Sequence, residues 1–446
     1  MTLVARSPNS RWEKRVLADE RADIPHASAR QLLLDVSHIA RHDARTGIQR
    51  VVRAIASALQ RQSLPDVRVK LVAADRTFFY RYLPDDWLQK QEPDRVLSLG
   101  DLDAVTVEKG DIFFGLDFCA SILREHEDRL ADWRAQGVEL NIVLYDLLPV
   151  THGHWFTFKM RRNFRKWLKL VERHADRVVA ISDSVAEQFA ARQKLDRDSR
   201  PLQIVTARLG SDISASLPSW GLPPDSGAVL DWLESHPTIL MVGTVEPRKG
   251  YEQVVAAFEH LWKHQPNPPQ LLIIGRGGWK TDKLQRTMRR ASGHGQFLWL
   301  DQASDEYLEQ IYSRATGLLV ASEGEGFGLP IVEGLSHGLP VLARDLPVFR
   351  ELQGSGVSFF SSSTPAELAS AVSRWISSSA DGKVRIVRAT TSWDDTASAL
   401  AAAIIPTGVN AASLRTIAET AEPGTSAERS QPEMRVGSVL RKEARR

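Results

Sequence analysis

The sequence has very little cysteine: Cys119 is the only one among 446 residues. A single cysteine excludes an internal disulfide and fits a reducing compartment, and we interpret Cys119 as a small core residue. The chain also lacks any run of about 18 apolar residues, the length that a membrane-spanning helix needs. Residues 1–30 are polar and charged and do not resemble a signal peptide. We therefore expect a cytoplasmic protein.

An excess of charge of one sign is also missing. The 57 Lys and Arg residues nearly balance the 55 Asp and Glu residues. No motif of a nucleic-acid-binding module occurs, so nothing indicates an RNA or DNA partner. The length exceeds what one hydrophobic core usually organises, which predicts two domains.

Short apolar runs alternate with helix-like segments on both sides of an irregular middle, a pattern typical of parallel α/β domains. We divide the chain into an irregular leader (1–29), a first α/β domain (30–215), a linker (216–236), a second α/β domain (237–388), a final helix (389–405) and a tail (406–446). The tail has no aromatic residue and little apolar content, which predicts disorder.

The most informative stretch is the glycine-rich segment 321–343, which follows the strand-like apolar run 317–320. Glycines at 324, 326 and 328 allow sharp turns and close approach to a ligand, and Pro330 suits the first turn of a helix. Glu325 and Glu333 stand eight positions apart, one on the loop and one on the helix. Two carboxylates beside a helix amino terminus suit a phosphate on the backbone N–H groups and sugar hydroxyls on the acids. The alternative is a glycine-rich turn with two solvated acids.

The string Glu-Gly-Phe-Gly-Leu-Pro with its second Glu resembles the signature of the retaining glycosyltransferases of family GT4, which have the GT-B fold. The resemblance covers roughly residues 31–405. It implies two Rossmann-like domains that face a central cleft, with a carboxy-terminal helix that crosses back to the first domain. It also implies that Glu325 holds the donor sugar and that Glu333 holds the ribose. The remaining donor contacts would come from the backbone of Gly326, Phe327, Gly328 and Leu329.

A second strand–loop–helix unit, 238–250, ends in Pro-Arg-Lys-Gly. Arg248 and Lys249 are two cations at the start of a helix, which suits a diphosphate leaving group whose charge grows as the glycosidic bond breaks. GT4 enzymes use such a pair in this way, and Gly243 also matches the family pattern at the donor. An exposed basic turn is the alternative.

Two loops of the first domain are further candidates. The helix that opens at Gly47 follows a strand and a polar loop, and in GT4 enzymes a glycine at this place faces the diphosphate, so Gly47 and Arg50 are donor candidates. Asp146 and His152 follow the strand 139–145, where an open α/β sheet places its chemistry. The loop resembles one in bacterial GT4 polysaccharide enzymes, so Asp146, His152 and also His154 are candidates for contacting the sugar or the acceptor. Alternatively, Asp146 only caps the loop and the histidines are surface groups.

Residues 155–173 combine Trp and Phe at helical spacing with many Arg and Lys. This segment could lie on the cytoplasmic face of an anionic inner membrane or receive a lipid-linked acceptor. The alternative is an amphipathic helix that packs on the sheet and exposes its basic side chains.

We expect no metal site and no cofactor. Asp101 and Asp103 form an Asp-x-Asp string of the kind that holds a divalent ion in other sugar transferases, but here the string lies in a polar loop before the next strand. The resemblance implies an enzyme that works without a bound metal.

The interpretation that follows is a glycosyltransferase that moves a hexosyl group from a nucleotide diphosphate sugar to a hydroxyl with retention of configuration. The resemblance is greatest to enzymes of bacterial surface polysaccharides such as the lipopolysaccharide O-antigen, which favours GDP-mannose as donor and a lipid-linked oligosaccharide as acceptor. The alternatives are a UDP-sugar-dependent transferase, a nucleotide-sugar 2-epimerase and an inactive nucleotide-sugar-binding subunit.

Overall fold

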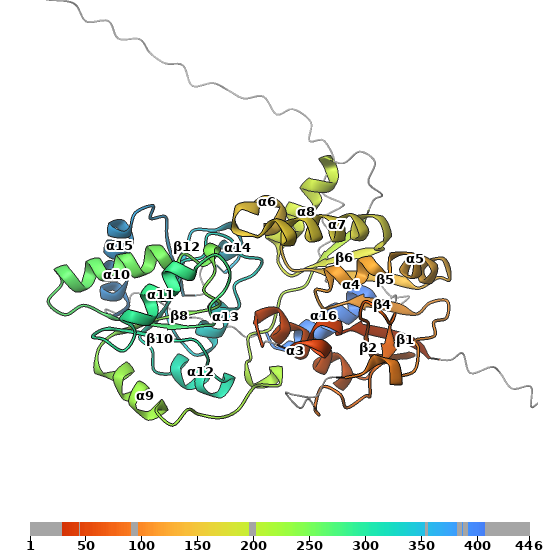
Figure 1. Cartoon of the computed structure of the whole chain (residues 1–446), viewed down its shortest axis with the longest axis horizontal. Helices are drawn as coiled ribbons and strands as arrows, with labels where there is room; N and C mark the ends of the chain where they lie inside the picture. The colour runs from red at the N-terminus through yellow and green to blue at the C-terminus, as the bar shows by residue number, and fades with distance from the viewer. Residues whose placement is uncertain are drawn as a thin grey trace, which may run out of the picture.

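The computed structural model describes residues 29–43, 45–90, 97–195, 202–352, 356–380, 386 and 391–405. The predicted tail and all of the predicted leader except residue 29 lie outside these ranges. The described chain forms two lobes, each built on its own sheet (Figure 1).

The first lobe contains a seven-stranded sheet with the order β3-β2-β1-β4-β5-β6-β7, in which only the β2–β3 pair is antiparallel. Its strands are β1 (Arg30–Asp35), β2 (Val67–Ala73), β3 (Arg81–Tyr82), β4 (Ile112–Gly115), β5 (Glu139–Leu144), β6 (Arg177–Ala180) and β7 (Gln203–Thr206). The helices around it are α2 (Ser37–Arg41), α3 (Gly47–Arg61), α4 (Ala120–Glu125), α5 (Glu127–Ala135), α6 (Leu148–Thr151), α7 (Phe158–His174) and α8 (Asp183–Leu195).

The second lobe contains a six-stranded, fully parallel sheet with the order β10-β9-β8-β11-β12-β13. Its strands are β8 (Thr238–Val242), β9 (Gln270–Ile274), β10 (Phe297–Leu300), β11 (Gly317–Val320), β12 (Val341–Arg344) and β13 (Val357–Phe360). Its helices are α9 (Ser226–Ser235), α10 (Tyr251–His264), α11 (Asp282–Ala291), α12 (Asp305–Tyr312), α13 (Leu329–Ser336), α14 (Pro347–Arg350) and α15 (Pro365–Ala380). The last described helix is α16 (Trp393–Ile404).

Apolar layers cover both faces of each sheet, which explains why the strands appear in the sequence as continuous apolar runs. In β1, Leu32 and Leu34 belong to one buried cluster together with α3 and α16. Leu33 belongs to the cluster on the opposite face, with α4, α5 and α7. The predicted two-domain α/β architecture is therefore confirmed.

Helix α16 follows the second sheet in sequence but packs on the first lobe, beside α3 (Figure 1). Trp393 is 1% exposed, and its indole N–H donates to the carbonyl oxygen of Asp212 at 2.7 Å. The backbone N–H of Ser211 also donates to the carbonyl oxygen of Thr391 at 3.2 Å, so the two chain crossings between the lobes lie side by side. The predicted helix that crosses back is confirmed.

The segment 216–236 differs from the irregular linker that its Pro, Gly and Ser content predicts. It contains α9, whose Val229 and Leu233 are buried in the second core. A short helix is easily missed between turn residues, because its single apolar stripe gives few periodic positions.

We predict that Trp393→Ala destabilises the first lobe by about 3 to 5 kcal/mol, since it removes a fully buried indole from that core. Urea denaturation followed by circular dichroism measures this loss. Asp394→Ala is the matched control, because Asp394 forms an exposed ion pair with Arg61 that contributes at most about 1 kcal/mol. Equal losses in the two variants would contradict the assigned role of α16.

Candidate active site

The candidate site lies where the carboxyl ends of the two sheets face each other. Strand order reverses between β1 and β4 in the first sheet and between β8 and β11 in the second, and ligands of open α/β sheets bind at such points. The loops meet directly: Ser182 Oγ donates to the carbonyl oxygen of Gly326 at 2.7 Å. A Cβ atom at Gly326 would lie 1.9 Å from the carbonyl oxygen of Tyr145, so this position tolerates no side chain.

Glu325 lies at the centre of the second-lobe loops. Its Oε1 accepts hydrogen bonds from Lys249 Nζ at 2.5 Å and from Ser322 Oγ at 2.8 Å, and its Oε2 pairs with Arg248. Burial alone would raise the pKa of Glu325, but the charges of Arg248 and Lys249 outweigh it and lower the pKa to about 2. Glu325 is therefore ionised at neutral pH.

The structure thus brings Arg248 and Lys249 into contact with Glu325, although 76 or more residues separate them in the sequence. Arg248 and Lys249 end a short 3-10 turn after β8, and Gly250 then begins α10 with φ 71°. Gly243, at φ 138°, completes the end of β8, where its carbonyl oxygen accepts a hydrogen bond from Tyr251 OH at 2.6 Å.

Asp146 approaches this cluster from the first lobe. It caps its own loop by accepting the N–H of Leu148 at 3.0 Å, as the structural alternative requires, but it also interacts electrostatically with Arg248, Glu325 and Lys249. Burial raises the pKa of Asp146, although Arg248 acts in the opposite direction.

The two histidines of this loop lie further out and are exposed. The ring of His152 stacks on Trp155 at a centroid distance of 4.5 Å, and the Trp155 ring lies against the backbone of Gly324. The carbonyl oxygen of His154 accepts a hydrogen bond from Lys280 Nζ of the other lobe at 2.6 Å. The Trp155 ring therefore lies between His152 and the loop that carries Gly324.

Glu333 lies on α13 and is 2% exposed. Its Oε2 accepts the Tyr312 hydroxyl at 2.9 Å, and its Oε1 pairs with Arg50 of the first lobe. Arg50 also pairs with Asp305. Arg50 was predicted beside the diphosphate, whereas the structure places its guanidinium on the carboxylate predicted to hold the ribose.

The loop between these acids has the form of an anion site. Gly328 takes φ 106° and precedes α13, and Pro330 lies in the first turn of that helix. Within the described residues, no hydrogen bond is found from the backbone N–H groups of Gly326 or Phe327. Gly47 approaches from α3, where a Cβ atom would be 3.6 Å from Leu329. Gly326 and Phe327 directly precede the α13 N-cap, so their N–H groups lie beside the amino terminus of that helix, a place that attracts phosphate.

The sequence analysis missed several residues that hold this cluster, namely Glu246, Asp305, Tyr312 and Ser322. Glu246 had a visible signal, since it stands two positions before Arg248, with which it pairs at 2.7 Å. Tyr312 and Asp305 gave none, because their partners come from distant parts of the chain. Among the described residues no group of three or more His, Cys, Asp or Glu is arranged to hold a metal ion.

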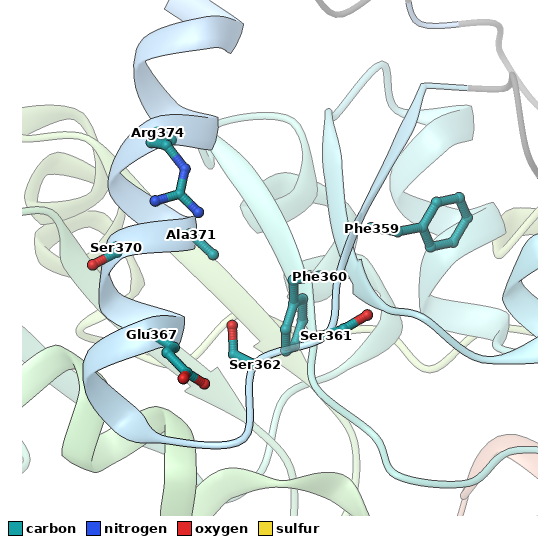
Figure 2. A pocket seen from close by; sticks show the side chains of 8 residues that line it. All are labelled: Phe359, Phe360, Ser361, Ser362, Glu367, Ser370, Ala371 and Arg374. Carbon is teal, nitrogen blue, oxygen red and sulfur yellow. The ribbon is translucent and has the colours of Figure 1, made fainter. Parts of the chain in front are cut away.

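A cavity of about 530 Å³ lies elsewhere in the second lobe, between the end of β13 and α15 (Figure 2). Figure 2 shows Phe359, Phe360, Ser361 and Ser362 from the strand end and Glu367, Ser370, Ala371 and Arg374 from the helix. None of the predicted site residues lines it, and we assign it no role.

Two mainly parallel sheets with opposed carboxyl ends and a cation-bound acidic loop between them are the arrangement of the GT-B fold, and comparison with known proteins agrees on the fold. Residues 227–393 match the family "Glycosyl transferases group 1". The chain is 38% identical over 352 residues to the serotype-specific mannosyltransferase WbdA of Escherichia coli, covering 78% of this chain and 41% of WbdA. It is 32% identical over 154 residues to O-antigen chain mannosyltransferase B of Escherichia coli, covering 34% of this chain and 40% of that enzyme.

The solved structures show the same fold. HepE of Anabaena in complex with UDP-glucose superposes with a TM-score of 0.55 at 16% identity, over 84% of this chain and 95% of HepE. WaaG, a glycosyltransferase involved in lipopolysaccharide biosynthesis, superposes with a TM-score of 0.51 at 14% identity, over 82% of this chain and 94% of WaaG. The protein has the GT-B fold, and the match to the glycosyl transferases group 1 family lies in its second lobe. It spans about 41% of the length of its WbdA relative. No helix in the described ranges is long and apolar enough to cross a membrane.

Two buried carboxyl groups, Asp35 and Asp117, lie at the carboxyl ends of β1 and β4 and should make the stability of the fold depend on pH. Burial raises the pKa of Asp35 to about 6 and that of Asp117 to about 7. A carboxyl whose pKa is raised by folding stabilises the native state below its unfolded pKa, and this stability is lost as pH rises through the folded value. For Asp117 this window runs from 3.8 to about 7.

We predict that Asp117→Asn reduces the loss of stability between pH 5 and pH 8 by about 2 kcal/mol, because an amide does not ionise. Urea denaturation at both pH values measures the difference. Exposed Asp132 of α5 supplies the control variant Asp132→Asn. An unchanged pH dependence in Asp117→Asn would show that Asp117 is already ionised in the folded protein at pH 5.

Proposed function

We propose that the protein is a retaining, metal-independent glycosyltransferase that moves a mannosyl group from GDP-mannose to a hydroxyl of a growing, lipid-linked surface polysaccharide. The observation that carries the proposal is the Arg248–Lys249–Glu325 cluster beside an open helix amino terminus, facing Asp146 across the cleft. The assignment of mannose and of a polysaccharide acceptor rests on the named activities of WbdA and of O-antigen chain mannosyltransferase B, and this chain covers less than half of each.

In the proposed reaction, the bond from the anomeric carbon to the β-phosphate oxygen breaks while a bond to the acceptor oxygen forms on the same face. The acceptor's proton passes to the departing phosphate oxygen. Arg248 and Lys249 neutralise the charge that develops on the diphosphate, and Glu333 orients the ribose. The backbone of Gly326 to Leu329 holds the sugar and diphosphate, so no nucleophilic side chain is required.

Glu325 and Asp146 would act on the sugar. Glu325 is an ionised acceptor for sugar hydroxyls, and Asp146 approaches the same cluster from the first lobe. His152, stacked on Trp155, would border the acceptor. Contacts from both lobes would fix the orientation of the anomeric carbon.

A thermal-shift screen against GDP-mannose, UDP-glucose, UDP-N-acetylglucosamine, GDP-fucose and the free nucleotides tests the donor. Ligand at about one hundred times its dissociation constant stabilises the folded state by about 2.7 kcal/mol. We expect stabilisation by guanine nucleotides. Stabilisation by uridine nucleotides alone would indicate a UDP-sugar donor instead of GDP-mannose. If no nucleotide stabilises the protein, the proposed function is contradicted.

The site assignment is tested by turnover with an added oligomannoside acceptor. We predict that Lys249→Ala and Glu333→Gln each lower turnover at least about tenfold, because each removes one charged contact to the donor. Circular dichroism checks that both variants are folded, since each change also breaks a buried ion pair. Lys283→Ala, an exposed lysine on α11, is the control. Product that appears only as free nucleotide and epimerised sugar would indicate the 2-epimerase, and binding without any product would indicate an inactive subunit.

We further propose that the protein contacts the cytoplasmic face of an anionic inner membrane through α7. Buried Phe164, Trp167 and Leu168 attach this helix to the first lobe, as the packing alternative predicts. Its amino terminus nevertheless leaves Phe158 76% exposed, and its outer face exposes Lys159, Arg162, Arg165, Lys166 and Lys169. A basic face beside an exposed aromatic ring suits anionic lipid headgroups.

We predict that Arg162→Glu/Lys166→Glu lowers sedimentation with vesicles containing phosphatidylglycerol about tenfold or more, since each basic residue near such a surface contributes about 1 kcal/mol. Arg286→Glu/Arg290→Glu on α11 changes the net charge equally at an exposed site of the other lobe. If both double variants sediment with the vesicles equally less, net charge and not the face of α7 determines binding. If neither variant loses sedimentation, α7 does not contact the membrane.

A further inference from the structure

Arg50 connects the two lobes at the proposed ribose site. It lies near the start of α3, and its guanidinium pairs with Glu333 through NH1 and with Asp305 through NH2. The three side chains are only 11%, 3% and 7% exposed. Two carboxylates of the second lobe are thus neutralised by one cation from the first.

Both carboxylates keep other partners on their second oxygen. Glu333 Oε2 accepts the Tyr312 hydroxyl at 2.9 Å, and the Tyr312 ring stacks on His337 at 5.3 Å. Asp305 Oδ2 accepts the N–H and the hydroxyl of Ser219 at 2.8 and 2.9 Å. Arg50 therefore holds one oxygen of each acid, while the second oxygen of each acid keeps its hydrogen bonds to other residues when Arg50 moves.

The proposed function sets up a competition for Glu333. The Glu333 side chain is 3% exposed, with Arg50 on Oε1 and Tyr312 on Oε2, so a ribose can reach the carboxylate only if one of these partners moves away. Tyr312 is buried within the second lobe, whereas Arg50 comes from the other lobe, so Arg50 is the partner that would move. A nucleoside must consequently displace a buried cation from its carboxylate.

A new partner for Arg50 would lie close by. Gly47, one turn earlier on α3, is against Leu329, the first residue of α13, so Arg50 starts beside the open helix amino terminus where a diphosphate would bind. Its Nε is buried and has no hydrogen-bond partner among the described residues. An arginine with a free donor near a phosphate site is suited to a charge-assisted, two-pronged contact.

We propose that Arg50 is a specificity-determining exchange residue: it occupies Glu333 when no donor is bound and moves to the donor's diphosphate when the ribose takes its place. This inference rests on the proposed nucleotide-sugar function and adds to it. When a nucleoside without phosphates binds, the Arg50–Glu333 ion pair is broken and no new charged contact replaces it. When a nucleoside diphosphate binds, the same ion pair is broken but Arg50 gains a contact with the diphosphate. The exchange thereby selects diphosphates over nucleosides.

The test compares guanosine with GDP on the full chain, with ligand-observed NMR for the weak nucleoside and titration calorimetry for GDP. Arg50→Ala should bind GDP about tenfold more weakly than wild type, because a charge-assisted contact is lost. The same variant should bind guanosine about threefold more tightly, because the competitor for Glu333 is gone. The expected result is that Arg50→Ala lowers the affinity for GDP and raises the affinity for guanosine.

Arg50→Lys keeps a positive charge beside the two buried acids and carries the test if Arg50→Ala does not fold. It should show the same two signs with smaller changes. Glu351→Ala is the matched control, because Glu351 also joins the lobes, accepting the N–H groups of Asp183 and Ser184 at 3.2 and 2.8 Å, but does not touch Glu333. We expect no opposite change for the two ligands in Glu351→Ala.

Weakening of both ligands in Arg50→Ala would overturn the exchange and leave Arg50 as a positioning residue for Glu333. Unchanged affinities would also overturn it. The same opposite change in Glu351→Ala would assign the effect to looser lobes instead of competition. If wild type binds neither guanosine and GDP nor uridine and UDP, the proposed function itself fails, a result distinguishable from failure of the exchange alone.

Discussion

Neutralisation of buried carboxylates is the constraint on which this cleft depends. An ionised carboxylate removed from water is very unfavourable unless a cation and hydrogen bonds replace its hydration. Glu325 and Glu246 obtain that partner from Arg248, in the same lobe. Glu333 obtains it from Arg50, in the other lobe. The position of each acid therefore fixes where a cation must lie, and with it the path of the loops that carry these side chains.

The two halves of the cleft consequently differ in what they require. The Arg248–Lys249–Glu325 group is complete within the second lobe, so it keeps its geometry however the lobes are placed. The Glu333 group is complete only when α3 is close. The sugar-and-phosphate half is thus preorganised, whereas the ribose half responds to the other lobe. A site divided in this way can retain its reactive geometry while the cleft opens to exchange ligands.

Sequence reasoning was most successful where one rule acts locally. Buried parallel strands appear as apolar runs, and the carboxyl ends of such strands converge. Lys249 and Glu325, each predicted separately to contact the donor, accordingly lie together across 76 residues. It did not predict α9, because turn residues surround a short apolar stripe. It also did not predict the pairing of Arg50 with Glu333, 283 residues away, because that contact depends on how two separately folded sheets face each other. No periodic pattern encodes such a relation.

The return of α16 to the first lobe has a consequence for biosynthesis. The core around β1 and α3 includes Trp393, Leu400 and Ile404, so it is incomplete until the whole second lobe has left the ribosome. At roughly 5 to 20 residues per second, the chain between β7 and α16 takes on the order of 10 to 40 seconds to synthesise. During that interval the second lobe can fold as a continuous unit, while the first exposes an apolar groove along α3. The domain made first is thus the domain that is finished last.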